Sequence, residues 1–304
     1  MGKIALVFSG QGNQYTGMGQ SFYETSPAAR TVFDTLDTLR PGTAQQCFTA
    51  DKETLSQTIN TQPCLFAANY AAAAAVAEAG IRPDFLAGYS LGEVPAMAFG
   101  GYLTLEQAFR YVCRRGEEMD KAARAQAGTM FAVMGKDLTA LEALCATLPG
   151  VYPVNYNCPG QTVVSCEAAQ ADAFAAAAKA AGFRSMKLAV SGGFHSPMMR
   201  PAADVLAAEF AALTLAVPAI PAIPAISNCT AQEYENASQM FLQIHSPVLW
   251  QRSVEYLIAQ GVTTFIEVGV GKTLTGLIGK ISNNVTALTV ENQEGLRRTL
   301  EVLS

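Results

Sequence analysis

A five-residue segment, Gly88-Tyr89-Ser90-Leu91-Gly92, constrains the fold of this chain more than any other. It follows the apolar run 85–87 and precedes a segment, 93–99, that suits a helix. A serine between two glycines at a strand-to-helix turn is typical of a nucleophile elbow, where a Cβ at either glycine would collide with neighbouring backbone. Such a turn exposes the Ser90 hydroxyl and directs the Leu91 N–H toward a developing oxyanion. The pattern therefore favours an α/β fold with a nucleophilic serine, although short glycine patterns also arise by chance.

The composition of the 304-residue chain indicates a compact globular protein that does not bind nucleic acid. Half of the residues are hydrophobic, and the length allows one large domain or a large domain with a small one. A net charge of −5 provides no general basic stripe for phosphates. Seven scattered cysteines without a Cys-x-x-Cys pair, and two histidines, favour reduced thiols over a disulfide frame or a metal site.

The sequence shows no sign of export or membrane insertion. Its first residues run almost directly into a predicted strand, without the pattern of a signal peptide. The alanine-rich run 67–77 is interrupted by Asn69 and is too short to span a bilayer. We therefore expect a cytoplasmic protein.

Apolar strands alternate with helical patterns in both halves of the chain. Strands are expected over 4–8, 85–89, 263–268 and 286–290, and helices over 63–78, 105–125, 274–281 and from 291 onward. This alternation predicts a largely parallel sheet with helices on both faces.

The middle of the chain has a different order of elements. Strands are expected over 129–134, 152–157, 162–166 and 185–190, with helices over 138–148 and 168–181. The order βαββαβ is the ferredoxin-like plan. We therefore predict an α/β-hydrolase-like core, residues 1–126 and 191–304, with an inserted ferredoxin-like subdomain over 127–190. The proline-rich stretch 218–224 is interpreted as a connector or edge segment.

A nucleophilic serine needs a base, and two histidines are available. His195 lies in a predicted loop between a strand and a helix, after Gly192 and Gly193, where backbone can approach closely. His245 ends a predicted helix and could simply bond a carbonyl or solvent. A single histidine is more often structural, but the loop position favours His195 as the base.

Two further features suit acyl transfer. Residues 9–14, Ser9-Gly10-Gln11-Gly12-Asn13-Gln14, could supply a second oxyanion donor, make a sharp turn, or cradle a phosphate. They lack the glycine patterns of nucleotide-binding loops. Arg114 and Arg115 lie on a predicted amphipathic helix; helical arginines are mostly solvated, but a guanidinium in the site would clamp a carboxylate.

Seven segments together resemble the malonyl-CoA:acyl carrier protein transacylases, the free-standing acyltransferases of bacterial fatty-acid synthesis. In order, they are Phe8–Gln14, Thr61–Pro63, Gly88–Glu93, Arg115–Gly116, Asn157–Gln161, Phe194–Ser196, and Glu267–Gly269 with Gly271–Lys272. The resemblance covers essentially the whole chain, and that family also has an inserted ferredoxin-like subdomain.

The resemblance implies a role for each matching position. Ser90 corresponds to the nucleophile and His195 to its base, while the backbone N–H groups of Gln11 and Leu91 correspond to the oxyanion hole. The main-chain carbonyl of Gln243 takes the place of a triad aspartate. The family implies malonyl-CoA as substrate, an acyl carrier protein as partner, no resident cofactor or metal, and a monomer.

The resemblance also extends to residues that bind the acyl group, and three positions of this chain differ from the family pattern. Arg115 corresponds to the arginine that binds the malonyl carboxylate, and Phe194 resembles malonyl-selective members. Tyr89 replaces the usual histidine, Val270 a frequent proline, and Ser9 another common proline. None of these departures removes a reacting group.

Other functions remain open at this level. A serine hydrolase such as a thioesterase shares the elbow, but the chain lacks its His-Gly-Gly-Gly motif and has no evident acid between Ser90 and His195 to orient the base. A non-catalytic carrier-docking module is a second alternative. A transferase could also serve polyketide synthesis or a malonate decarboxylase. Lys121, Arg124 and Lys187 could form a docking patch for an acidic carrier or be ordinary solvated charges.

Overall fold

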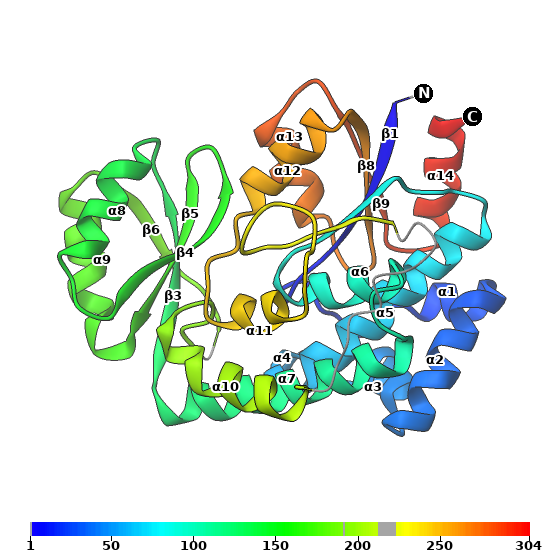
Figure 1. Ribbon diagram of the computed structural model, residues 1–304, viewed down its shortest axis with the longest axis horizontal. Coiled ribbons are helices and arrows are strands. Elements are labelled where there is room, and N and C mark those ends of the chain that lie inside the picture. The colour runs from blue at the N-terminus through cyan, green and yellow to red at the C-terminus, as the bar shows by residue number, and fades with distance from the viewer. Residues whose placement is uncertain (1, 191, 212–222) are drawn as a thin grey trace.

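The larger of two sheets is parallel throughout and lies at the centre of the molecule (Figure 1). A computed structural model describes residues 2–190, 192–211 and 223–304. The strand order is β7-β2-β1-β8-β9, with every neighbouring pair parallel. The strands are β1 (Lys3–Phe8), β2 (Phe85–Gly88), β7 (Ala225–Ile226), β8 (Val262–Val268) and β9 (Thr286–Val290). The predicted parallel sheet is confirmed.

Helices cover both faces of this sheet because its strands are apolar on both sides. Leu6 and Phe8 of β1 join one buried cluster, whereas Ala5 and Val7 join another. The first cluster is closed mainly by α1 (Gln20–Thr25), α2 (Pro27–Leu39), α3 (Thr43–Thr49), α4 (Lys52–Ser56), α5 (Thr58–Glu78), α6 (Glu93–Phe99), α7 (Leu105–Ala125), α10 (Arg200–Glu209), α11 (Ser238–Ile244) and α14 (Gln293–Leu303). The second is closed by α12 (Trp250–Ala259) and α13 (Thr273–Ile281). Alternating strand side chains thus hold two helical layers.

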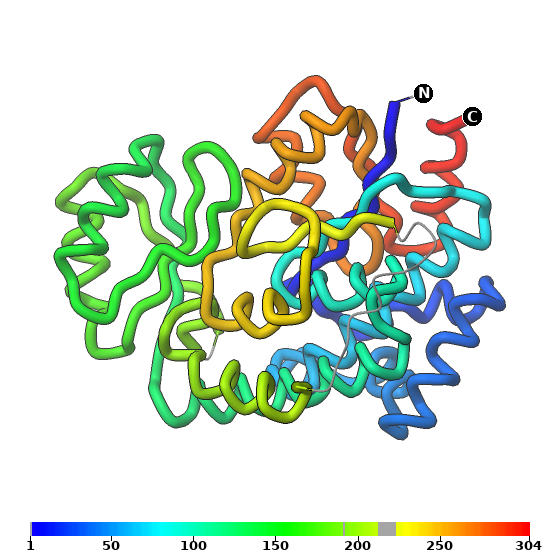
Figure 2. The backbone as a smooth tube through the Cα atoms, in the orientation of Figure 1, coloured from blue at the N-terminus to red at the C-terminus, as the bar shows by residue number. Residues whose placement is uncertain are grey.

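The second sheet belongs to the segment between α7 and α10. Its elements are β3 (Gly128–Met134), α8 (Leu138–Ala146), β4 (Val151–Cys158), β5 (Gln161–Glu167), α9 (Ala171–Ala180) and β6 (Arg184–Lys187). The antiparallel order β4-β5-β3-β6 is that of a ferredoxin-like unit. Phe131 and Phe174 meet in its own small core, with ring centroids 5.3 Å apart. Figure 2 shows this green unit beside the parallel core. All helices and strands of the ferredoxin-like unit lie within residues 127–190. The exact limits of the subdomain stay a prediction.

Two predicted boundaries are wrong, and one segment lies outside the described residues. The helix expected from Pro63 begins at Thr58, because the preceding turn is stabilised by the Thr61 hydroxyl, which donates to the carbonyl of Leu55 at 2.6 Å. The last subdomain strand ends at Lys187 rather than at residue 190, since the chain then turns so that residues 188 and 190 line a cavity. Most of the proline-rich stretch, 218–222, is not described.

The turn after β2 packs so tightly that it requires glycine at both ends. A Cβ on Gly88 would lie 2.0 Å from the backbone nitrogen of Glu93. One on Gly92 would lie 2.1 Å from the carbonyl oxygen of Phe8 at the end of β1. Backbone atoms at such distances cannot move aside as flexible side chains can. The two glycines therefore determine how closely the turn approaches β1.

We expect Gly92→Ala to lower the free energy of unfolding by about 1–3 kcal/mol or more, because about 1–3 kcal/mol is the usual cost of overpacking a rigid site. Gly276→Ala is the matched control, because no atom lies within 4 Å of a Cβ built there in α13. That control should be neutral or stabilising by about 0.5–1 kcal/mol. Thermal unfolding followed by circular dichroism measures both; equal melting temperatures would contradict this account of the turn.

Candidate active site

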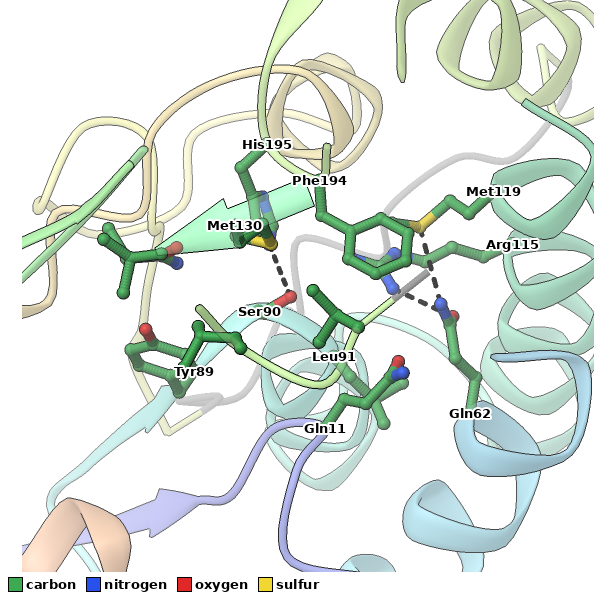
Figure 3. A pocket seen from close by; sticks show the side chains of 14 residues that line it. Gln11, Gln62, Tyr89, Ser90, Leu91, Arg115, Met119, Met130, Phe194 and His195 are labelled. Atoms are coloured by element: carbon green, nitrogen blue, oxygen red, sulfur yellow. Dashed lines mark hydrogen bonds between the residues drawn. The ribbon is translucent and has the colours of Figure 1, made fainter. Parts of the chain in front are cut away.

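Ser90 stands at the sharp turn between β2 and α6 and faces a histidine from the distant loop before α10. Its φ of 53° lies in the left-handed region, which non-glycine residues rarely adopt. Its Oγ is 2.7 Å from Nε2 of His195, 105 positions along the chain (Figure 3). The two side chains that the sequence singled out are thus in direct contact.

His195 is held in one orientation by backbone. Its φ is 61°, and its side chain is buried. The ring Nδ1 lies 2.9 Å from the main-chain carbonyl oxygen of Gln243 in α11. A carbonyl can only accept, so Nδ1 carries the proton and Nε2 is left to accept one from Ser90. His245, the other histidine, caps the end of α11 and is half-buried.

The surroundings keep the His195 imidazole neutral. Burial, and to a lesser degree the nearby guanidinium of Arg115, together lower its pKa to about 4. Hydrogen bonds to backbone only partly oppose these effects. A neutral imidazole can accept a proton at physiological pH, as a general base must.

Gln11 and Leu91 line the same cavity as the serine and histidine. Gln11 follows β1, and the adjacent Gly10 packs so closely on the elbow that a Cβ would lie 2.6 Å from the Tyr89 carbonyl oxygen. The loop after β1 therefore lies so close to the backbone and ring of Tyr89 that only glycine fits at position 10. This contact brings the segments of both predicted oxyanion donors to one side of the site (Figure 3).

Asn69 of α5 fixes the loop after β1 to the loop after β8. Its Nδ2 donates to the Ser9 carbonyl at 2.8 Å, and its Oδ1 accepts from the Val270 N–H at 3.2 Å. The Ser9 hydroxyl also donates to this oxygen, at 3.2 Å. Two of the departures from the family pattern, Ser9 and Val270, thus share one buried partner.

Arg115 is the charged group of the cavity and is almost completely buried, with 1% exposure. Its guanidinium donates to the Oε1 atoms of Gln62 and Gln243, at 2.8 and 2.9 Å. Gln62 is oriented in turn by donation to the sulfur of Met119 at 3.4 Å. Among the described residues, the Arg115 Nε has no hydrogen-bond partner, and no carboxylate lies within ion-pair distance of this side chain. A buried cation held by neutral amides is well suited to receive an anion.

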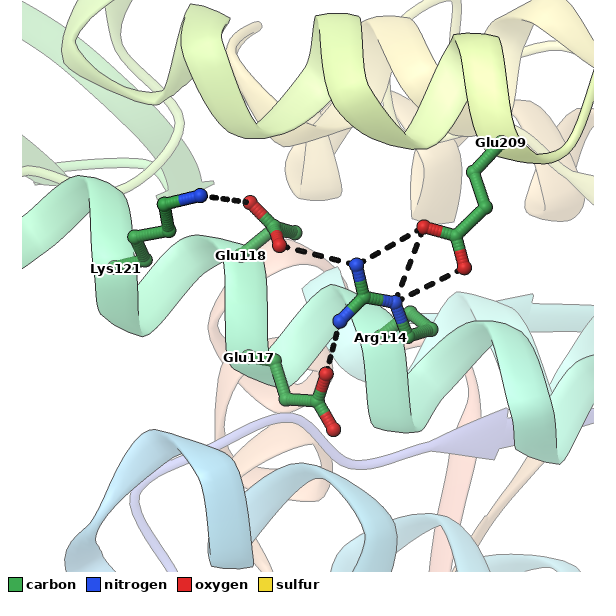
Figure 4. A network of polar contacts seen from close by, with 5 residues as sticks. All are labelled: Arg114, Glu117, Glu118, Lys121 and Glu209. Atoms are coloured by element: carbon green, nitrogen blue, oxygen red, sulfur yellow. Dashed lines mark hydrogen bonds and ion pairs between the residues drawn. The ribbon is translucent and has the colours of Figure 1, made fainter.

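The neighbouring Arg114 has a different environment (Figure 4). It forms ion pairs with Glu117 and Glu118 on α7 and with Glu209 on α10. These partly exposed pairs join two helices and leave Arg114 outside the cavity. The two positions lie about 100° apart around α7, so Arg115 shares a face with the buried Val112 and Met119, whereas Arg114 does not. This helical spacing is a signal in the sequence that could have separated the two arginines.

The cavity in front of Ser90 holds about 110 Å³ and combines side chains from core and subdomain. It is lined by Gln11, Gln62, Tyr89, Ser90, Leu91, Arg115, Met119, Met130, Asn155, Val163, Leu188, Val190, Phe194 and His195. Apolar groups predominate around a few converging polar ones, as in most small-molecule sites.

Sequence reasoning missed two residues behind the elbow. Asn228, in the loop after β7, accepts from the Ser90 N–H with its Oδ1 at 2.8 Å. The carboxyl of Glu93 accepts from the Asn228 N–H at 2.6 Å, and burial raises the pKa of Glu93 to about 8. Glu93 ends the recognised segment Gly88–Glu93, but Asn228 had no sequence signal because its partner Ser90 lies 138 positions away.

Tyr89, the third departure from the family pattern, connects the elbow to the subdomain. Its hydroxyl donates to Oδ1 of Asn157 at 2.7 Å, and its ring packs edge-on against Trp250.

Across the residues that the structure describes, no cluster of metal-ligating side chains was found, and no helix combines the length and apolar character needed to cross a membrane.

Comparisons with known proteins agree on one family. Residues 5–291 match the acyl transferase domain family. A malonyl CoA-acyl carrier protein transacylase of Bacillus subtilis is 39% identical over 100% of this chain and 98% of its own length. The crystal structure of that enzyme from Clostridium perfringens superposes with a TM-score of 0.93 at 33% identity, covering 99% of this chain and 97% of the other. A malonyl-transacylase solved in complex with a type II polyketide acyl-carrier protein gives 0.92 at 32% identity, covering 99% of both chains.

The fold and the serine–histidine site thus occur together in a chain that matches acyltransferases over nearly its whole length. The chain belongs to the acyl transferase domain family and, within it, to the malonyl CoA-acyl carrier protein transacylases.

The two histidines allow a direct test of the buried site by NMR. We expect the His195 ring proton signals to titrate with a midpoint near pH 4, because burial and Arg115 disfavour the imidazolium. The half-buried His245, whose pKa is also lowered by burial and by Arg200, provides the second signal for comparison. His245→Gln assigns the pair; a His195 midpoint at or above the ordinary 6.5 would contradict the described environment.

Proposed function

We propose that this protein transfers a malonyl group from malonyl-CoA to the phosphopantetheine thiol of an acyl carrier protein. The observation that carries the proposal is a buried guanidinium, Arg115, in the same small cavity as a hydrogen-bonded Ser90–His195 pair. One group suits a free carboxylate and the other suits an acyl transfer. The names of the similar proteins point to the same substrate and partner.

The first half-reaction forms a malonyl-serine ester. His195 accepts the hydroxyl proton of Ser90 at Nε2 as Oγ attacks the thioester carbonyl carbon. The resulting oxyanion accepts hydrogen bonds from the main-chain N–H groups of Gln11 and Leu91. When the tetrahedral intermediate collapses, the carbon–sulfur bond breaks and His195 returns the proton to the departing CoA thiolate. The Gln243 carbonyl keeps the imidazole oriented throughout.

The second half-reaction repeats these steps with another thiol. The phosphopantetheine thiol gives its proton to His195 and attacks the ester, and Ser90 is released with its hydroxyl restored. A cavity of about 340 Å³ that shares Gln11 and Tyr89 with the site suits the arm, since it is lined by Asn13, Asn157 and other residues of both units. This order of events is a ping-pong mechanism, and it requires no resident cofactor or metal.

The charge and size of the site account for the choice of acyl group. The malonyl carboxylate pairs with Arg115, whose buried cation otherwise has amide partners. A cavity of about 110 Å³ is smaller than the roughly 300–1,000 Å³ of drug-sized ligand sites. Phe194 is a wall of this cavity and restricts a branch on the acyl chain. Short dicarboxylic acyl units are therefore preferred.

Hydrolysis is the alternative reaction for the same serine. It would need water to attack the ester, whereas the Ser90 site is lined mainly by apolar side chains, which do not bind or orient water. An arginine buried in the acyl cavity is also unexplained by a general thioesterase. The pathway served, whether fatty-acid synthesis, polyketide synthesis or malonate decarboxylation, depends on the carrier protein.

The cysteines and the resemblance to the family bear on location and assembly. The seven cysteines are free, as expected for a reducing cytoplasm, and we propose a cytoplasmic monomer. Of the three basic residues considered for carrier docking, Lys121 and Arg124 pair with acids on α7 at 3.6 and 2.8 Å. Lys187 is exposed and stays a docking prediction.

Mass spectrometry of the intact protein tests the covalent step. After incubation with malonyl-CoA, we expect one malonyl adduct on wild-type protein and none on Ser90→Ala. Addition of a holo acyl carrier protein should remove the adduct and yield malonyl carrier. Loss of the adduct to water at the same rate without carrier would favour the hydrolase, and an adduct on Ser90→Ala would exclude the assigned nucleophile.

Arg115→Ala should reduce malonyl transfer and relax the preference for malonyl over acetyl. Loss of a buried charge partner is worth about 3–5 kcal/mol, so we expect kcat/KM for malonyl-CoA to fall by roughly 10²–10³-fold. Arg114→Ala is the matched control, since the adjacent guanidinium pairs with surface glutamates. Parallel assays with malonyl-CoA and acetyl-CoA measure selectivity; an equal loss for both acyl groups would contradict the role of Arg115.

A further inference from the structure

We propose that Asn228 is a positioning residue that holds the elbow in its reactive conformation. The inference rests on the proposed role of Ser90 as nucleophile and adds a residue that the family resemblance did not assign. Asn228 does not touch the acyl cavity. It acts through the backbone groups on either side of Tyr89, the residue that precedes Ser90.

The side-chain amide of Asn228 satisfies two backbone groups of the elbow at once. Its Oδ1 accepts from the Ser90 N–H at 2.8 Å, and its Nδ2 donates to the Gly88 carbonyl at 2.6 Å. These two groups flank Tyr89, so the amide bridges the turn in the way that a neighbouring strand would. The amide is buried, and water is therefore not available to replace either bond.

This bridge stabilises a backbone conformation that Ser90 would otherwise avoid. A φ of 53° is unfavourable for a residue with a Cβ, and it persists only when surrounding contacts determine it. Without the Asn228 oxygen, the Ser90 N–H would be a buried donor with no partner. The turn would then relax, and Oγ would move away from His195.

Asn228 is itself fixed by two further contacts. Its own N–H donates to the buried Glu93 carboxyl at 2.6 Å, and its carbonyl accepts from the Leu249 N–H at 2.9 Å. The parallel register aligns Ile226 of β7 with Ala87 of β2, which brings the loop after β7 beside the elbow. The short edge strand thus serves to deliver one amide to the turn.

The same network reaches the groups that orient the base and the substrate. Gln243 donates from Nε2 to the Ser90 carbonyl at 2.6 Å and to Asn228 Oδ1 at 3.4 Å. Its Oε1 accepts from Arg115, and its main-chain carbonyl orients His195. Both backbone polar groups of Ser90 are therefore held by amide side chains. Gln243 also binds the Arg115 guanidinium with its side chain and the His195 ring with its main-chain carbonyl.

Asn228→Leu removes both bonds with little change in volume. We expect kcat for malonyl transfer to a holo carrier to fall about 10²-fold, as for a displacement of reacting groups by roughly 1 Å. KM for malonyl-CoA should stay within about threefold, because Arg115 and the cavity walls remain. Labelling of Ser90 by a sulfonyl fluoride, which needs no malonyl recognition, should slow by a similar factor.

Asn60→Leu is the control for loss of an asparagine that forms structural bonds. Asn60 donates to the Thr54 carbonyl at 3.1 Å at the start of α5, away from the cavity, and its substitution should leave kcat and labelling unchanged. Asn228→Asp keeps an acceptor for the Ser90 N–H but loses the donor to Gly88. Asn228→Asp should reduce kcat about tenfold. If Asn228→Leu does not fold, the kcat of Asn228→Asp tests the positioning role instead.

The outcomes separate this inference from the proposed function. A folded Asn228→Leu whose kcat and labelling rate are within about threefold of wild type would overturn the positioning role, as would a raised KM with unchanged kcat. If Asn228→Leu does not fold, an unchanged kcat in Asn228→Asp has the same meaning. A wild-type protein that forms no malonyl adduct would instead refute the proposed function.

Discussion

Backbone-to-backbone packing at the elbow is the constraint on which the site depends. The turn after β2 touches the end of β1 so closely that a Cβ at Gly92 would lie 2.1 Å from the Phe8 carbonyl oxygen. A comparable approach joins Gly10 to the Tyr89 carbonyl. Because Gly10 and Gly92 have no Cβ, the loops after two neighbouring parallel strands converge at one point, as expected at the carboxyl ends of such strands. Ser90 stands at that point.

The polar groups around Ser90 are mostly neutral amides and carbonyls, and this choice determines the charge of the site. A carbonyl, rather than a carboxylate, accepts from His195. A nearby aspartate would raise the pKa of the imidazole, whereas burial and Arg115 keep it near 4. Arg115 likewise is held by Gln62 and Gln243 rather than by an acid. The His195 imidazole is therefore neutral, and a neutral amide environment leaves the guanidinium able to pair with the carboxylate of the proposed substrate.

The two units of the molecule have different tasks in this arrangement. The parallel core supplies the serine, the base and the arginine, while the ferredoxin-like unit supplies much of the apolar wall, including Met130 and Val163. The units are joined near the site by the Tyr89–Asn157 hydrogen bond and by main-chain bonds between Val248 and the strand β4. The site thus lies where movement of one unit relative to the other would change its width.

Local patterns in the sequence determined the elements, the elbow and the small βαββαβ unit, because strand period, glycine geometry and helix signals act over a few residues. The resemblance to a family predicted the roles of Ser90, His195 and Arg115. Only the tertiary structure gave Arg115 its two glutamine partners and brought Asn228 to the elbow, since the Arg115 contacts span 53 and 128 positions and the Asn228 contact spans 138. Such contacts depend on strand register and close packing across the sheet, which no short stretch of sequence encodes.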